Sequence, residues 1–263
     1  SGASNTAVGK DALDSNTTAS FNTAVGASAM VANTTGTNNV ALGSAAMTAN
    51  TTGGNNTAVG RRALDANTTA SSNTAVGADS LTTNITGQYL TAVGSQALKN
   101  NTGDNNAAVG YRALEENTTG IKNSAFGTEA LRENTTGGNN TGCGYGALFN
   151  NTTGSNATGV GFAAGYNNTT GTITALGSQA LYTNVTGNNN TALGISALYA
   201  NTADNNTAVG HAALTANTTG TMNVAMGGFA LDANTTGNWN SAFGYAALGS
   251  NTTASYNCAF GYY

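Results

Sequence analysis

The sequence predicts an all-β protein, a β-solenoid of about sixteen coils with 16 to 17 residues in each coil. The segment Asn-Thr-Ala-Val-Gly at 5–9 returns along the whole chain, and its closing glycine recurs every 17 residues, or every 16 on three occasions. Ala, Val and Leu also keep fixed places within each repeat. A short fixed period of this kind is typical of coils that stack on their neighbours. We therefore expect residues 1–263 to form a single repeat array without capping segments.

Composition argues against several classes of function. Only 7% of the residues are charged, the net charge is −4 and no basic cluster occurs, so nucleic acid is not an expected partner. One histidine and two cysteines give no cluster of metal ligands, and we expect no cofactor. No convergent set of acids, bases and nucleophiles indicates an enzyme. No apolar run is long enough to suggest membrane insertion.

Asn-Thr-Ala-Val-Gly is interpreted as a short strand that ends where glycine lets the chain turn. We call residues at the same place in successive coils a rank. Adjacent side chains of a strand point to opposite faces, and here both the Ala rank and the Val rank are apolar. One face should fill a thin interior, while the other packs against a second copy of the chain or another segment of the same fibre. A small rank suits the interior and a rank of variable size suits the seam, but the sequence does not decide which face is inside. The candidate apolar seam or core comprises Val8, Val25, Leu42, Val59, Val76, Val93, Val109 and Phe126.

The segment after each glycine, Gly-x-x-Ala-Leu, is expected to form a second short strand or a bend that adds another apolar rank. A helix this short would be marginal. Cys143 and Cys258 are expected to be small apolar substitutes at core ranks. The charged residues are all expected in exposed turns, because none falls at a predicted core rank.

An asparagine stands seven residues after each glycine of a complete repeat. Stacked Asn side chains can hydrogen-bond along a rank and satisfy buried turn backbone, which predicts a structural ladder. The alternative is N-glycosylation, because Asn16-Thr17-Thr18 and its copies match Asn-x-Thr. The predicted ladder includes Asn16, Asn33, Asn50, Asn67, Asn84, Asn101, Asn117 and Asn134.

Aromatic residues are the most function-like feature. Phe149, Tyr166, Tyr182 and Tyr199 occupy the same rank on four successive coils. Exposed aromatic rows can bind the faces of sugars or another fibre. The alternative, which we favour, is that the rings stack and stabilise the array or its seam.

The units at 56–70, 106–120 and 206–220 follow the pattern Asn-Thr-Ala-Val-Gly-x-x-Ala-Leu-x-x-Asn-Thr-Thr-Gly with small variations, and they resemble repeats of two groups. One is the head of YadA-like trimeric autotransporter adhesins, and the other is the repeat shaft of phage-type tail fibres. The resemblance covers nearly all of the chain. The adhesin group implies a left-handed β-roll that forms a trimer, and both groups imply a location outside the cell or on a cell or virion surface.

The leading hypothesis is a non-enzymatic extracellular structural or adhesive fibre protein, which associates with itself side by side and end to end into a filament or fibre shaft. A cell-surface glycan or receptor is a further candidate partner. The alternative is an ice- or glycan-binding repeat surface, because Thr6, Thr23, Thr57 and Thr74 stand beside the Val rank in a Thr-x-Val pattern.

Overall fold

The computed structural model describes residues 2–263, which form a β-solenoid of sixteen parallel strands with no helix in the described range. The predicted fold class is confirmed. The chain divides into two compact units, Ser1–Thr136 and Gly137–Tyr263, and each is described by itself. The first unit contains β1 (Thr6–Val8), β2 (Thr23–Val25), β3 (Val40–Leu42), β4 (Thr57–Val59), β5 (Thr74–Val76), β6 (Thr91–Val93), β7 (Ala107–Val109) and β8 (Ser124–Phe126). The second contains β9 (Thr141–Cys143), β10 (Thr158–Val160), β11 (Ile173–Leu176), β12 (Asn190–Leu193), β13 (Thr207–Val209), β14 (Val224–Met226), β15 (Ser241–Phe243) and β16 (Cys258–Phe260).

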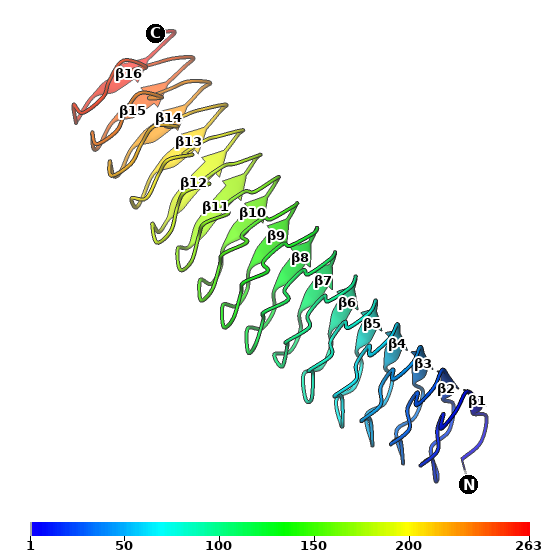
Figure 1. Ribbon diagram of the computed structural model, residues 1–263. Helices are drawn as coiled ribbons and strands as arrows, with labels where there is room; N and C mark the ends of the chain where they lie inside the picture. Colours follow the sequence, from blue (N-terminus) through cyan, green and yellow to red (C-terminus); the bar gives the residue numbers. More distant parts are fainter. Residues whose placement is uncertain (1) are drawn as a thin grey trace. The chain divides into compact units, whose positions relative to one another are not determined.

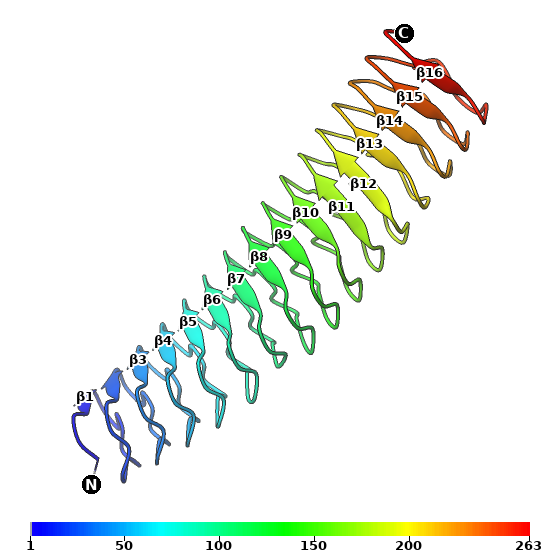
Figure 2. The ribbon, with the colours of Figure 1, turned by 180° about the vertical axis from the view of Figure 1, so that it is seen from behind.

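Within each unit every strand pairs in parallel with the next, one coil further along the chain (Figures 1 and 2). Equivalent residues are exact partners: Ala58 pairs with Ala75, and Ala175 pairs with Ala192. The coils with 16 residues keep this register, because the missing residue is lost from a turn and not from a strand.

The middle residue of each strand points into the coil. Ala58, Ala75 and Ala92 are fully buried, so the small rank fills the interior as expected. Of the eight residues named as seam or core, none is buried: Val59, Val76 and Val109 are half-exposed and the other five are exposed. The core alternative for these residues is wrong, because alternation along a three-residue strand leaves only the middle side chain inside. The Val rank lies on the outer surface.

The glycine after each strand lets neighbouring coils meet backbone to backbone. Gly60 has a φ of 137°, a region that other residues rarely adopt, and a Cβ atom on it would lie 2.6 Å from the carbonyl oxygen of Gly77. Glycine is therefore required at this position for two reasons: its positive φ, and the lack of space for a Cβ atom.

The Gly-x-x-Ala-Leu segment forms consecutive turns, so the expectation of a second strand is wrong and that of a bend is right. In the coil after Gly60, Arg62 and Leu64 adopt left-handed φ values of 56° and 53°. Ala63 and Leu64 are fully buried and form the predicted apolar rank. A left-handed residue costs about 1–2 kcal/mol, which burial of a leucine side chain, at about 1.5–3 kcal/mol, offsets.

One coil of the second unit shows how the core adjusts to a change at the Leu rank. Gly165 occupies that rank, and a Cβ atom on it would lie 2.8 Å from both Ile173 Cδ1 and Leu148 Cδ2. Ile173 stands where most coils have asparagine, and its side chain fills the space that a leucine at 165 would occupy.

Candidate functional site

The predicted Asn ladder lies inside the coil. Within the first unit, Asn33, Asn50 and the later members are fully buried, while Asn16 is half-exposed. Asn50 Nδ2 donates to Asn33 Oδ1 at 2.8 Å and to the carbonyl oxygen of Gly53 at 3.0 Å. Asn67 Nδ2 repeats both bonds one coil further on, at 2.8 Å to Asn50 and 3.1 Å to Ala70 O. These amide nitrogens are engaged in the folded chain, so they are not accessible acceptors for a glycan.

A second buried Asn rank precedes the strands, and the sequence argument missed it. Asn39 Nδ2 donates to Gly53 O at 2.8 Å, and Asn39 Oδ1 accepts from the backbone N–H of Asn56 at 2.9 Å. In the next coil, Asn56 Oδ1 likewise accepts from the backbone N–H of Asn73 at 3.0 Å. The signal was present in the sequence, because asparagine also recurs four residues before most of the periodic glycines. It was overlooked because the residue was assigned to the start of the strand.

The outer strand face carries two ranks in each unit. The last residue of each strand supplies the Val rank, and the residue two before it supplies a rank in which threonine is the commonest residue. In the first unit, Val8 is 57% exposed and Phe126 is 46% exposed. In the second unit, Leu193 and Phe260 are likewise exposed. The face is therefore a regular, uncharged surface of hydroxyl, methyl and larger apolar groups.

The aromatic row forms a continuous stack in the second unit. The ring centroids of Phe149 and Tyr166 lie 4.9 Å apart, those of Tyr166 and Tyr182 5.4 Å, and those of Tyr182 and Tyr199 5.2 Å, with interplanar angles of 11°, 16° and 3°. All four residues are half-buried. Each ring covers a face of its neighbour, so inner rings offer edges to a ligand and not faces. This geometry supports a stabilising role.

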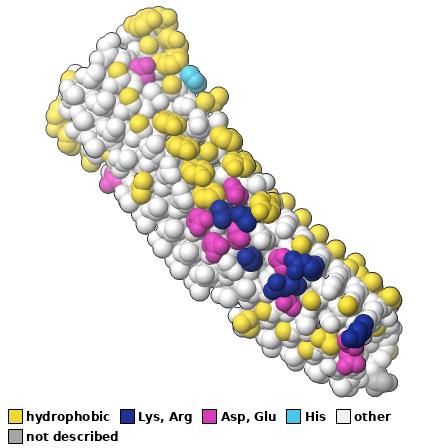
Figure 3. Space-filling model, viewed as in Figure 1, with side chains coloured by type: hydrophobic (Ala, Val, Ile, Leu, Met, Phe, Trp, Pro, Cys, Tyr) yellow, Lys and Arg dark blue, Asp and Glu magenta, His cyan; other side chains and the backbone are white. Residues whose placement is uncertain are grey.

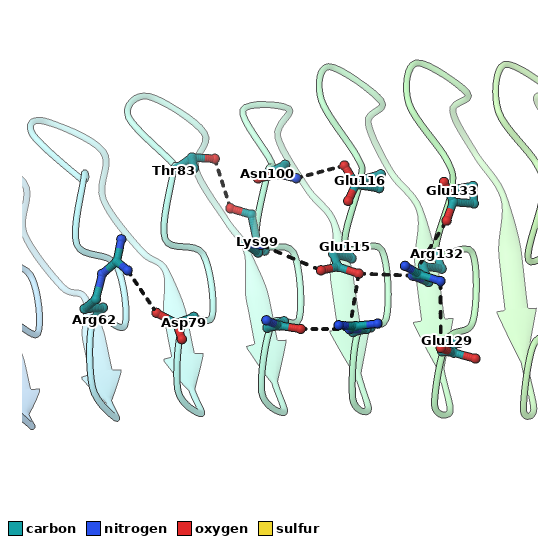
Figure 4. Close-up of polar contacts among 12 residues, drawn as sticks. Arg62, Asp79, Thr83, Lys99, Asn100, Glu115, Glu116, Glu129, Arg132 and Glu133 are labelled. Carbon is teal, nitrogen blue, oxygen red and sulfur yellow. Dashed lines mark hydrogen bonds and ion pairs between the residues drawn. The ribbon is translucent and has the colours of Figure 1, made fainter.

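Most charged side chains on the face shown in Figure 3 lie in groups that contain both signs. The largest group, in the first unit, centres on Glu115, whose residue is only 4% exposed. The expectation that every charge lies in an exposed turn is wrong at this position. Glu115 is surrounded by Arg132 Nε at 3.1 Å, Arg112 Nε at 3.5 Å and Lys99 Nζ at 3.8 Å (Figure 4). The positive charges of Lys99, Arg112 and Arg132 compensate the buried negative charge of Glu115.

The Arg132 guanidinium is held in its charged form by this group. Burial lowers its pKa, but the hydrogen bond to Glu115 and the nearby carboxylates of Glu133 and Glu129 outweigh burial and raise the pKa above its ordinary value. Arginine is protonated at all physiological pH values in any case. The Arg132 guanidinium is therefore a permanent positive charge beside these carboxylates.

The cysteines do not occupy core ranks. Cys143 and Cys258 are both exposed free thiols. Cys143 takes the third position of β9 and Cys258 the first position of β16, and both positions face outward. The expected burial was wrong because the sequence argument had not settled which strand face is inside.

Within residues 2–263, no group of three or more His, Cys, Asp and Glu side chains is arranged to hold a metal ion. His211 makes an edge contact with the ring of Phe229, with centroids 4.9 Å apart. No helix of the described chain is both long and apolar enough to cross a membrane.

Comparison with known proteins gives no relative: no family model, no curated protein and no solved structure matches this chain.

Proposed function

We propose that this chain is a non-enzymatic structural segment of an extracellular fibre and that it associates side by side with copies of itself. The observation that carries this proposal is the outward Val rank of the first unit. All eight strands β1–β8 place a Val, Leu or Phe at the third position, and none of these side chains is buried. Contiguous exposed apolar surface of this extent marks an interaction site.

A second copy of the chain is the partner that fits this surface best. The rank is continuous along eight successive coils, with residues in exact register, such as Val59 with Val76 and Val76 with Val93. A periodic apolar row is complementary to another row with the same period. It also carries no charge that a partner would have to neutralise. Self-association buries the row without burying an unpaired charge.

The interior supports a mechanical role. Two buried Asn ranks, two buried Ala ranks and one Leu rank repeat in nearly every coil, so the same contacts hold each coil to the next. The free energy of unfolding of such an array is approximately a sum of similar interaction energies between neighbouring coils.

The adhesive part of the proposal is that the surface of the chain binds a cell-surface glycan or receptor. Binding to a glycan array tests it.

The experiment replaces Val59, Val76 and Val93 with Lys. Three charges on adjacent coils cannot be buried in an apolar seam, so the oligomer should dissociate to monomers in sedimentation velocity. The matched control replaces Thr52, Thr69 and Thr86 with Lys, which adds the same charge at exposed turn positions on the same coils. An oligomer unchanged by the Val substitutions would overturn the seam, and an equal loss in the control would assign the effect to charge alone.

A further inference from the structure

We propose that the outer strand face of the Gly137–Tyr263 unit binds ice. The inference concerns β9–β13 and does not rest on the lateral association proposed for β1–β8. In each of these five strands a threonine stands directly before the buried small residue: Thr141, Thr158, Thr174, Thr191 and Thr207. This is the longest uninterrupted run of threonine at that rank, which in the first unit is broken by Val40, Ala107 and Ser124.

The five threonines form a straight row because parallel pairing fixes their register. Thr158 is the partner of both Thr141 and Thr174, and Thr191 is the partner of Thr174 and Thr207. Neighbouring strands of a sheet lie about 4.8 Å apart, which sets the spacing of the hydroxyl groups along the row. Threonine is branched at Cβ and has few rotamers, so little side-chain freedom is lost when the row meets an ordered surface.

The hydroxyl groups of this row are available to an external partner. None of the five Oγ1 atoms forms a hydrogen bond within the described part of the chain, although their backbone groups bond to the neighbouring coils. The other threonine rank in the same unit uses its hydroxyls internally: Thr169 Oγ1 donates to Val185 O at 3.0 Å, and Thr202 Oγ1 donates to Thr218 O at 3.0 Å. All five strand threonines are exposed or half-exposed. The same residue type thus has an internal and an external role at two different ranks.

A second row completes a two-dimensional pattern. Val160, Leu176, Leu193 and Val209 stand two residues after their threonines and face the same side. Two residues of a strand span about 6.6 Å, so hydroxyl and apolar groups alternate on a grid of about 4.8 by 6.6 Å. These repeats are comparable with those of oxygen atoms on the surfaces of hexagonal ice. A grid of this kind can hold water molecules in positions that continue the crystal.

The chemistry of the face favours ice over other occupants. Neither row contains a charged residue in β9–β13, which suits an uncharged lattice of hydrogen-bond donors and acceptors. Sugar sites are concave, with a few convergent polar groups and an open aromatic face, whereas this face is periodic and has no aromatic ring at either row of these five strands. The support beneath it is rigid, because Ala175, Ala192 and Ala208 are fully buried directly behind the face.

The test measures thermal hysteresis and ice recrystallisation with the chain of residues 1–263. The wild-type chain should show hysteresis, and Thr174→Lys, at the centre of the row, should remove most of it. Thr174→Val keeps the shape of the side chain and should reduce hysteresis less than Lys does. The control is Thr186→Lys, an exposed turn position in the same unit. It should leave hysteresis unchanged, and circular dichroism would establish that all variants keep the wild-type fold.

Two results would overturn the inference. The first is a wild-type chain without hysteresis; if Thr174→Lys then changes the oligomeric state, the face is an interface between copies of the protein. The second is a folded Thr174→Lys chain that retains hysteresis.

Discussion

Asn50 and Asn39 donate hydrogen bonds to the same atom, the carbonyl oxygen of Gly53, at 3.0 and 2.8 Å. The two asparagines come from different ranks, so one turn carbonyl joins both ladders. Asn50 Oδ1 in turn accepts from Asn67, and Asn39 Oδ1 accepts from the backbone of Asn56. The polar core is therefore a network that runs along the stack and not a set of isolated caps.

Asn50→Ala should lower the free energy of unfolding by about 1–3 kcal/mol, because it leaves the buried Asn33 Oδ1 without this donor and Gly53 O with one donor fewer. Asn39→Ala should have a similar effect, because the backbone N–H of Asn56 loses its acceptor. Denaturant unfolding measures both. The control is Thr69→Ala, whose side chain is exposed. Asparagine variants as stable as this control would show that the ladders contribute little.

Two adjacent glycines give a sharp test of the stacking contact. Gly227 has a φ of 136°, and a Cβ atom there would overlap the carbonyl oxygen of Gly244. Gly227→Ala should destabilise the chain by more than about 2 kcal/mol, from backbone strain and overpacking together. At Gly228 the nearest atom to an added Cβ is Tyr245 Cδ2, at 3.5 Å, so Gly228→Ala should change stability by less than about 0.5 kcal/mol. Thermal unfolding compares the two, and equal effects would contradict the account of the glycine rank.

Glu115→Gln should destabilise the first unit by about 1–2 kcal/mol. The substitution keeps the shape of the side chain but leaves Lys99, Arg112 and Arg132 close together without their shared anion. Glu133→Gln is the matched control, because Glu133 is more exposed and contacts only Arg132 among the basic groups, so its loss should cost less than about 0.5 kcal/mol. Urea unfolding at low and high salt would separate the two effects. A Glu115→Gln chain of wild-type stability would show that the cluster is a neutral surface feature.

The buried Asn rank also predicts how the chain responds to N-glycosylation. Each Asn-Thr-Thr unit of this rank is an Asn-x-Thr acceptor while the chain is unfolded, yet its amide nitrogen is buried and hydrogen-bonded after folding. Secretion through a compartment with oligosaccharyl transferase should therefore give glycosylated, misfolded chains. The same chain made in the cytosol should fold.

Glycosidase treatment with gel mobility, followed by circular dichroism, measures both forms. A glycosylated chain with the dichroism and solubility of the cytosolic chain would show that the buried rank tolerates modification.

Much of the fold follows from the sequence because the repeat itself reports the geometry. The strand at Thr57–Val59, the glycine at 60 and the apolar pair Ala63-Leu64 were all located by their period. The small size of the Ala rank suits a thin interior, but the sequence alone does not decide which strand face points inward; the structure places Ala58 inside.

Other features depend on contacts between coils that a single repeat does not encode. The backbone of Leu64 has a left-handed φ, which leucine rarely adopts. Burial of the leucine side chain offsets the free-energy cost of that conformation. Glu115 is buried because cations arrive from the coils before and after it. Cys143 is exposed because its place in the strand, and not its chemistry, decides its environment. The candidate surfaces were thus only partly predictable: the rows could be located, but the direction in which each faces could not.

The central claim is that the outward Val rank of β1–β8 joins copies of this chain side by side. Cryo-electron microscopy of the purified chain over a range of concentrations tests it most directly, because particle cross-sections show how many solenoids lie abreast. The account predicts particles with two or more solenoids in parallel contact through the Val rank, and single solenoids when Val59, Val76 and Val93 are replaced by Lys. Single solenoids of the wild-type chain at every concentration would contradict it.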